Sequence, residues 1–197
     1  DTVFDLEAEL MSEFAEQFGV AEGTAVVTGN GVRKPEGFMD TSSSSALSST
    51  NSGSSTSIAD TNGQADGMIE LQHAIKTAYA ANSQWLLNRQ TLGSVRKMKD
   101  GDNNYIWRFG LGEGNPNTIL GDSYIEVSDM ANEAANAFPI AYGDWRRAYT
   151  LIDRLAMSVM RDPYTRASSG QVKFVARRRV GGQIMLSEAA RVLKCST

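Results

Sequence analysis

The chain has 197 residues, 41% of them hydrophobic, and a formal net charge of −4. This length and composition favour one large domain or two small ones that share a core, and they exclude a disordered chain. The single cysteine, Cys195, excludes an internal disulfide and a cysteine-based zinc site, and no apolar run approaches the roughly 20 residues of a membrane helix.

The first element expected is an amphipathic helix over residues 2–18. Its apolar residues recur at spacings of three and four, at Val3, Leu6, Leu10, Phe14 and Phe18. Asp1 or Thr2 is placed to cap it, and Gly19 is expected to end it. A short extended piece is expected at 25–27, followed by turns at 28–31 and 35–39.

The middle of the chain has weaker signals. Residues 41–61 are rich in Ser and Thr, which predicts a mobile surface loop. Helices are expected over 67–82 and 84–92, then a turn at 101–104, an extended piece at 105–109 and a loop at 110–117. A short strand is expected at 123–127, and residues 130–137 fit either a helix or an irregular segment.

The last third of the chain alternates like β-strands. Apolar residues recur at every second position over 155–160 and again over 172–177, and the loop 162–170 lies between them. This pattern predicts a long antiparallel hairpin, interrupted at Gly181-Gly182 and followed by residues 184–186 and a short segment at 187–193. The predicted fold class is therefore α+β: a long helix, a long two-stranded arm and a mixed body.

Charge is divided between the two ends of the chain. Residues 1–22 hold seven acids and no Lys or Arg, for −7, whereas residues 144–197 hold eleven bases and four acids, for +7. Such a separation indicates that the two ends complement each other, within a subunit or between subunits, with a chance distribution of solvated charges as the alternative.

No set of residues predicts catalysis, a cofactor or a metal. The only histidine, His73, falls in a predicted helix without a nucleophile motif, and a hydrolase built on it is the weaker alternative to a structural histidine. The glycines at 29–31 and 110–114 lack the Lys-Ser/Thr of a phosphate-binding loop. Asp100 and Asp102 begin no calcium loop, because its twelfth position is Leu111.

Three consecutive arginines, Arg177, Arg178 and Arg179, invite comparison with phosphate-binding patches. In a strand, however, Arg177 and Arg179 face one side and Arg178 the other. A nucleic-acid-binding module therefore remains only an alternative, and pairing with the acidic helix or with another subunit is favoured.

An ordered set of segments resembles the major capsid proteins of tailed phages, which have the Hong Kong 97-like fold that encapsulins share. The segments are 29–39, 81–91, 92–100, 116–124, 139–154, 162–165 and 172–182. Among them, Pro139-Ile-Ala-Tyr-Gly-Asp-Trp-Arg-Arg-Ala-Tyr is the most specific, whereas Ser123 stands where the family often has Pro.

The resemblance implies how the chain is divided. Residues 1–39 would form the spine helix and turns of a peripheral domain, and residues 151–180 its hairpin. Residues 40–150, with the Ser-rich loop 41–61, and residues 181–197 would form the axial domain. The family's N-terminal arm and extended loop would precede Asp1. This chain begins without Met and is expected to be a trimmed, processed or partly ordered product. Residues 168–171 hold no asparagine, so covalent cross-linking is not expected.

The resemblance also implies function. The chain would be a subunit of an icosahedral shell of pentamers and hexamers around viral DNA, part of a virion assembled in the bacterial cytoplasm, with scaffolding and portal proteins as further partners. An encapsulin-like compartment that holds protein cargo is the alternative. The candidate residues for subunit contacts are Glu7, Glu9, Glu13, Arg154, Arg177, Arg178 and Arg179. No catalytic residue, cofactor, metal or membrane contact is expected.

Overall fold

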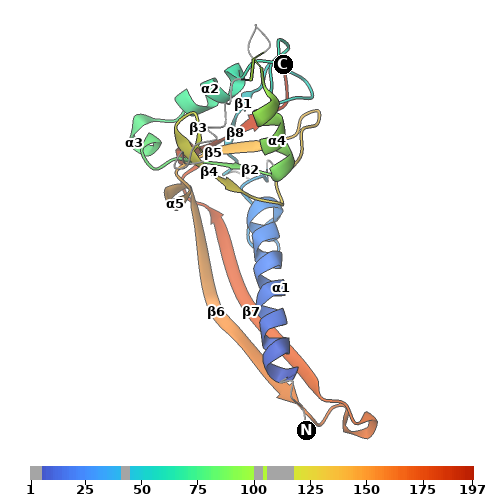
Figure 1. Cartoon of the computed structure of the whole chain (residues 1–197). Helices are drawn as coiled ribbons and strands as arrows, with labels where there is room; N and C mark the ends of the chain where they lie inside the picture. Colours follow the sequence, from blue (N-terminus) through green and yellow to red (C-terminus); the bar gives the residue numbers. More distant parts are fainter. Residues whose placement is uncertain (1–5, 41–44, 100–103, 106–117) are drawn as a thin grey trace. The chain divides into compact units, whose positions relative to one another are not determined.

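The computed structural model describes residues 6–40, 45–99, 104–105 and 118–197 (Figure 1). The chain divides into unit 1, residues 1–37 and 151–183, and unit 2, residues 38–150 and 184–197. The elements are α1 (Leu6–Thr28), β1 (Ser48–Asn51), α2 (Asp66–His73), α3 (Thr77–Ala80), β2 (Gln84–Leu87), α4 (Arg89–Lys97), β3 (Thr118–Ile119), β4 (Asp122–Glu126), β5 (Ile140–Gly143), α5 (Trp145–Ala148), β6 (Tyr149–Asp162), η1 (Ala167–Ser169), β7 (Lys173–Ile184), η2 (Ser187–Ala189) and β8 (Ala190–Lys194). The peripheral and axial domains expected from the sequence stay a prediction for these two units.

Helix α1 of unit 1 is longer than the sequence suggested. It runs past Gly19 to Thr28, so both the predicted end at Gly19 and the extended piece at 25–27 are wrong. Gly19 stands in open space, and an interior glycine costs only about 1 kcal/mol relative to alanine. Burial of Ala25 and Val27 in the last turns favours continuing the helix.

Two glycines make the turn after α1 possible. The amide of Gly29 donates to the carbonyl of Ala25 at 2.9 Å, and the amide of Gly37 donates to the carbonyl of Gly29 at 2.7 Å. A Cβ on Gly29 would lie 2.1 Å from the Pro35 oxygen, and one on Gly37 would lie 2.5 Å from the Val27 oxygen. The backbones on either side of the turn therefore approach to a distance that only glycine allows.

The predicted hairpin is confirmed. Strands β6 and β7 form a two-stranded sheet, run in opposite directions, and lie beside α1 within unit 1 (Figure 1). The expected interruption at Gly181-Gly182 is wrong, because β7 continues through both residues to Ile184. At the other end of the hairpin, the Asp162 carboxylate accepts the amides of Tyr164 and Thr165 and the Thr165 hydroxyl.

Unit 2 is built on a mixed sheet with the strand order β1-β8-β5-β2-β4-β3. Strands β1 and β8 are parallel, as are β2 and β4, while β8–β5, β5–β2 and β4–β3 are antiparallel. In the centre Trp85 is opposite Tyr142, with ring centroids 4.3 Å apart. The buried cluster of unit 2 includes side chains from α2, α4, β2, β5 and β8: Met68, Leu71, Leu92, Val95, Trp85, Leu87, Ile140, Tyr142 and Leu193.

Two predicted helices are wrong in part. Residues 84–92 begin as strand β2, whose Trp85, Leu86 and Leu87 are all buried between β4 and β5, and α4 starts only at Arg89. The Asn88 side chain caps α4 by accepting the Thr91 amide at 2.7 Å. The helix expected over 67–82 is two shorter ones, because Lys76 between them is extended at ψ 140°.

The described part of the Ser-rich segment is not a loop throughout. Ser48–Asn51 forms β1, which pairs in parallel with β8, and the loop prediction is wrong there. The hydroxyl of Ser52 donates to the carbonyls of Ser54 and Ser57, and Ile58 is buried. The segment therefore adds an edge strand and an apolar side chain to unit 2.

The remaining short predictions had mixed results. The strand at 123–127 is confirmed as β4, one residue earlier, and residues 130–137 are irregular. Strand β5 and helix α5 had not been predicted. Tyr105 bridges to Lys99, whereas the rest of 105–109 and the loop 110–117 lie outside the described residues.

Candidate functional site

His73 and Cys195, the only histidine and cysteine of the chain, are not placed for catalysis or metal binding in the described part of the structure. The His73 ring donates from Nδ1 to the Ile69 carbonyl of its own helix at 2.9 Å. Cys195 is buried, and burial raises the pKa of its thiol, which keeps it protonated and a poor nucleophile. Over residues 6–40, 45–99, 104–105 and 118–197, no three His, Cys, Asp or Glu side chains gather as metal ligands.

The first glycine motif, residues 29–31, does not lie where a phosphate-binding loop would place it. Residues 29–31 follow the C-terminus of α1, where backbone carbonyls point outward and an anion is disfavoured. The second glycine motif and the turn with Asp100 and Asp102 lie outside the described residues. None of the described helices is long and apolar enough to cross a bilayer.

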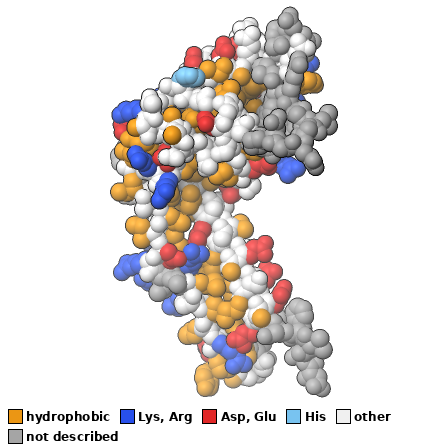
Figure 2. All heavy atoms as spheres, turned by 60° about the vertical axis from the view of Figure 1, so that its left-hand side comes forward, with side chains coloured by type: hydrophobic (Ala, Val, Ile, Leu, Met, Phe, Trp, Pro, Cys, Tyr) orange, Lys and Arg blue, Asp and Glu red, His pale blue; other side chains and the backbone are white. Residues whose placement is uncertain are grey.

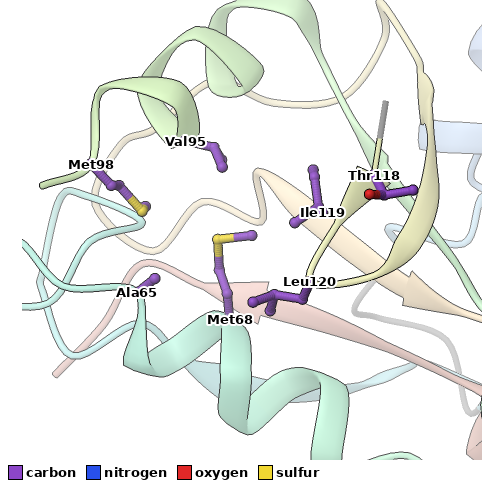
Figure 3. Close-up of a pocket in the computed structure, with 7 residues that line it drawn as sticks. All are labelled: Ala65, Met68, Val95, Met98, Thr118, Ile119 and Leu120. Carbon is purple, nitrogen blue, oxygen red and sulfur yellow. The ribbon is translucent and has the colours of Figure 1, made fainter. Parts of the chain in front are cut away.

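One cavity of unit 2 is apolar. It has a volume of about 170 Å³ and lies between α2, α4 and β3, and the side chains of Met68 and Met98 point into it (Figure 3). Its other lining residues are Ala65, Val95, Thr118, Ile119 and Leu120. Among the residues that the structure describes, no titratable side chain lines this cavity, so these residues supply no group for acid–base chemistry.

The acidic candidates lie on α1 of unit 1. Glu7, Glu9 and Glu13 are all exposed, but they do not share one face. Glu9, Glu13 and Glu16 follow the spacing of four and three that places side chains on one side of a helix, whereas Glu7 lies near the opposite side. We call Glu9, Glu13 and Glu16 the acidic face.

Arg178, in contrast, forms two ion pairs within its own chain. Its Nη1 lies 3.0 Å from Oε1 of Glu22 on α1, and its Nη2 lies 2.9 Å from Oδ2 of Asp153 on β6. The side chain is only 27% exposed. Arg178 therefore joins the helix to the hairpin inside unit 1, and a reversal of its charge would disturb that unit as well as any contact between subunits.

Arg154 and Arg179 meet two cations that sequence analysis had not selected. Together with Arg33, Lys34 and Arg178 they line a pocket of about 530 Å³ at the base of the hairpin, where Gly31, Ile152, Val180 and Gly181 also contribute. Among the residues that the structure describes, no acidic side chain is part of this lining. We call Arg33, Lys34, Arg154 and Arg179 the basic pocket. Figure 2 shows Lys and Arg side chains among apolar ones on the hairpin side of unit 1, and a row of acids along one border of that unit.

The structure thus brings together part of the predicted set. Arg154, Arg178 and Arg179 line one pocket, where Arg178 is paired with Glu22 and Asp153, while exposed Arg177 does not line it. Glu16 had not been selected as a candidate, although helical spacing alone groups it with Glu9 and Glu13. Arg33 and Lys34 gave no signal, because only the turn after α1 carries them to the hairpin.

Comparisons with known proteins agree on one family. The model of the phage capsid family matches residues 1–195. The capsid of an empty GTA particle and that of a native GTA particle, both computed with C5 symmetry, match at TM-score 0.89 over 100% of this chain and 68% of theirs, at 33% and 34% identity. The capsid of Myoviridae phage XM1 matches at TM-score 0.64 and 13% identity over 98% of this chain and 66% of that one, which supports the fold alone. A comparison with curated proteins returned no match.

The fold is therefore the Hong Kong 97-like capsid fold that the ordered motifs implied. Membership in a capsid family, together with this fold, indicates a structural component of a particle and gives no support to an enzymatic function. The chain belongs to the phage capsid family and is a structural subunit of a capsid shell.

Proposed function

We propose that copies of this chain assemble as pentamers and hexamers into a closed icosahedral shell that encloses DNA. The observation that carries the proposal is the match of the whole chain, at TM-score 0.89, to the capsid of a GTA particle in both its empty and its native form. Assembly would take place in the bacterial host cytoplasm, with scaffolding and portal proteins as further partners and without sequence-specific DNA contacts.

Shell assembly requires subunits whose edges complement each other and repeat. A contact between two different surfaces of one chain recurs from copy to copy and closes into a ring when the rotation allows it. The charged residues of unit 1 suit such an edge: Glu7, Glu9 and Glu13 on α1, and Arg154, Arg177 and Arg179 on the hairpin. Arg178 is the exception in the proposed set, since its partners are Glu22 and Asp153 of its own chain.

Electron microscopy of the full-length gene product tests the proposal. The protein is expressed alone and together with its neighbouring genes, and particles are purified by sedimentation and imaged. We expect closed icosahedral particles. A stable monomer or dimer in both expressions would contradict the proposal and make a binding role for the basic residues the next hypothesis.

The cargo distinguishes a DNA shell from an encapsulin-like compartment. Particles from the host with its neighbouring genes are treated with nuclease, opened, and analysed for protected DNA and for protein other than the shell subunit. Nuclease-protected DNA is the expected result. A stoichiometric internal protein without DNA would instead identify a protein-filled compartment.

A further inference from the structure

Four of the five cations that line the pocket at the base of the hairpin in unit 1 have no ion-pair partner among the residues that the structure describes. Arg33, Lys34, Arg154 and Arg179 are all exposed, and none of the ion pairs among the described residues includes any of them. The nearby carboxylates of Glu22 and Asp153 are already bound to Arg178. Five cations line this hollow, and these two acids balance only Arg178, so the other four repel each other and the pocket is complementary to a group of several negative charges.

The acidic face of α1 is the matching surface, and its direction follows from Glu22. Because Glu22 binds Arg178, the side of α1 that carries Glu22 faces the hairpin. Glu13 precedes Glu22 by nine residues, which is two and a half turns of about 3.6 residues, so it points away from the hairpin. Glu9 and Glu16 point the same way as Glu13.

The two surfaces of one subunit therefore cannot meet each other. Glu13 lies about 14 Å from Glu22 along the axis, on the far side of a helix about 10 Å across. Ion pairing needs nitrogen and oxygen atoms within about 4 Å. A carboxylate group from the acidic face can reach a basic pocket only on another molecule.

We propose that the acidic face of one copy, Glu9, Glu13 and Glu16, binds in the basic pocket of the neighbouring copy. The proposal rests on the proposed shell function and names the partner surface for it. The contact joins two different surfaces. Each copy therefore binds one neighbour through its acidic face and another through its basic pocket, and the contact repeats around a ring. Phosphate groups would suit the same cations, and they are an outcome that the test distinguishes.

Charge exchange between the two surfaces is the test. One variant carries E9K, E13K and E16K, and the other carries R33E, R154E and R179E, all in the full-length protein. The combined variant keeps the net charge of the wild type. We expect each single-surface variant to need about tenfold more subunit for half-maximal assembly, because three ion pairs become repulsive, and the combined variant to assemble like the wild type.

Mixing separates contacts between copies from contacts within one chain. In a mixture of the two single-surface variants, the lysine face of one variant meets the glutamate pocket of the other, and the native face meets the native pocket. We expect larger species in sedimentation than either variant gives alone, a result that pairing inside one chain cannot produce. Circular dichroism and thermal unfolding of each variant confirm that the subunits are folded.

A matched control changes three exposed acids of unit 2, Asp66, Glu70 and Glu126, to Lys. It alters the net charge as much as the acidic-face variant does, and it should assemble at the wild-type concentration. If the control fails equally, or the combined variant assembles no better than its parents, the proposed contact is wrong.

The outcomes also separate this inference from the shell function. Wild-type particles together with normal assembly of both single-surface variants would overturn the inference and leave the function intact. Loss of packaged DNA with normal shells from the R33E/R154E/R179E variant would assign the pocket to phosphate and overturn the inference too. If the wild type gives no particles in either expression, the function fails, and this inference fails with it.

Discussion

At the scale of single residues, Gly143 is fixed by the closeness of two strands. A Cβ at this position of β5 would lie 2.4 Å from the Ala190 Cα and 2.5 Å from the Ala189 oxygen. We expect Gly143→Ala to destabilise unit 2 by about 1–3 kcal/mol, because backbone atoms of β8 cannot move aside as a flexible side chain would. Urea unfolding followed by circular dichroism measures the change.

Gly93 in α4 is the matched control for Gly143. A Cβ added at Gly93 would meet no neighbouring part of the chain within 4 Å, so Gly93→Ala removes only the entropic cost of a glycine in a helix. It should stabilise unit 2 by about 0.5–1 kcal/mol. An unchanged unfolding midpoint for Gly143→Ala would show that the sheet accommodates a Cβ between β5 and β8, and it would contradict the prediction.

Tyr142 gives a prediction about alkaline pH. Its hydroxyl donates to Oδ2 of Asp122 at 2.7 Å, and the same oxygen accepts the side-chain amide of Gln72. Burial first, and then the bond to Asp122, raise the pKa of Tyr142 from 10.0 to about 12. Since the folded protein holds this proton more tightly, the stabilisation is complete below pH 10 and is lost as the pH rises through 12.

Denaturant unfolding between pH 9 and 12 should therefore show falling stability of the wild type, and a smaller fall in Tyr142→Phe. Part of the fall remains in that variant, because the hydrogen bond to Glu188 also raises the pKa of Tyr79. Phenolate absorbance of the folded protein should lose a group that titrates near pH 12 in Tyr142→Phe. Equal pH profiles for the two proteins would contradict the assignment.

At the scale of elements, Arg178 is the residue that joins α1 to the hairpin. Arg178→Gln leaves the carboxylates of Glu22 and Asp153 close together without their cation. We expect unit 1 to lose about 1–3 kcal/mol, and Arg177→Gln, an exposed neighbour on the other face, to change stability by no more than about 0.5 kcal/mol. Hydrogen exchange of the α1 amides reads out unit 1 directly. Equal exchange in both variants would remove Arg178 from this role.

The elements also show what sequence patterns are able to predict. The apolar spacing of α1 and the alternation of β6 and β7 depend on nearby residues, and these elements were found. Strand β2 was mistaken for a helix because Trp85-Leu86-Leu87 is a short apolar run, which suits either structure until its neighbours are known. Strand β1 was missed because its partner β8 lies far away in sequence, and Ser48–Asn51 has no apolar pattern of its own.

The candidate site divides in the same way. Helix periodicity alone groups Glu16 with Glu9 and Glu13 and separates Glu7 from them. The basic pocket, however, depends on the turn that Gly29 and Gly37 permit, since this turn brings Arg33 and Lys34 to Arg154 and Arg179. That meeting requires long-range contacts, and no local pattern of the sequence encodes it.

At the scale of the whole molecule, assembly through charged surfaces should weaken with salt. Raising the ionic strength from 0.1 M to 1 M shortens the Debye length from about 10 Å to about 3 Å. We expect the subunit concentration needed for half-maximal assembly to rise with NaCl, and to rise equally in the charge-exchanged variant with both surfaces altered. Light scattering measures it. An assembly that strengthens with salt would instead indicate contacts dominated by apolar surface.

The division into two units makes a last prediction about folding. The carbonyl of Ala148 accepts the amide of Met185 at 2.9 Å and that of Leu186 at 3.3 Å, so the chain leaves unit 2 and returns to it at neighbouring points. Unit 2 also has its own buried cluster around Trp85 and Tyr142. A polypeptide without residues 1–37, in which a turn of about three residues replaces 151–183, should therefore fold.

We expect this excised unit 2 to unfold cooperatively and to keep the near-ultraviolet circular dichroism of its packed aromatic rings. Gly143→Ala in the same polypeptide should lower its melting temperature, which shows that the native sheet has formed. The excised unit should not assemble, because it lacks both the acidic face and the basic pocket. A non-cooperative, expanded product would mean that unit 2 needs unit 1 in order to fold. The stability of each charged-surface variant would then have to be measured before its assembly is interpreted.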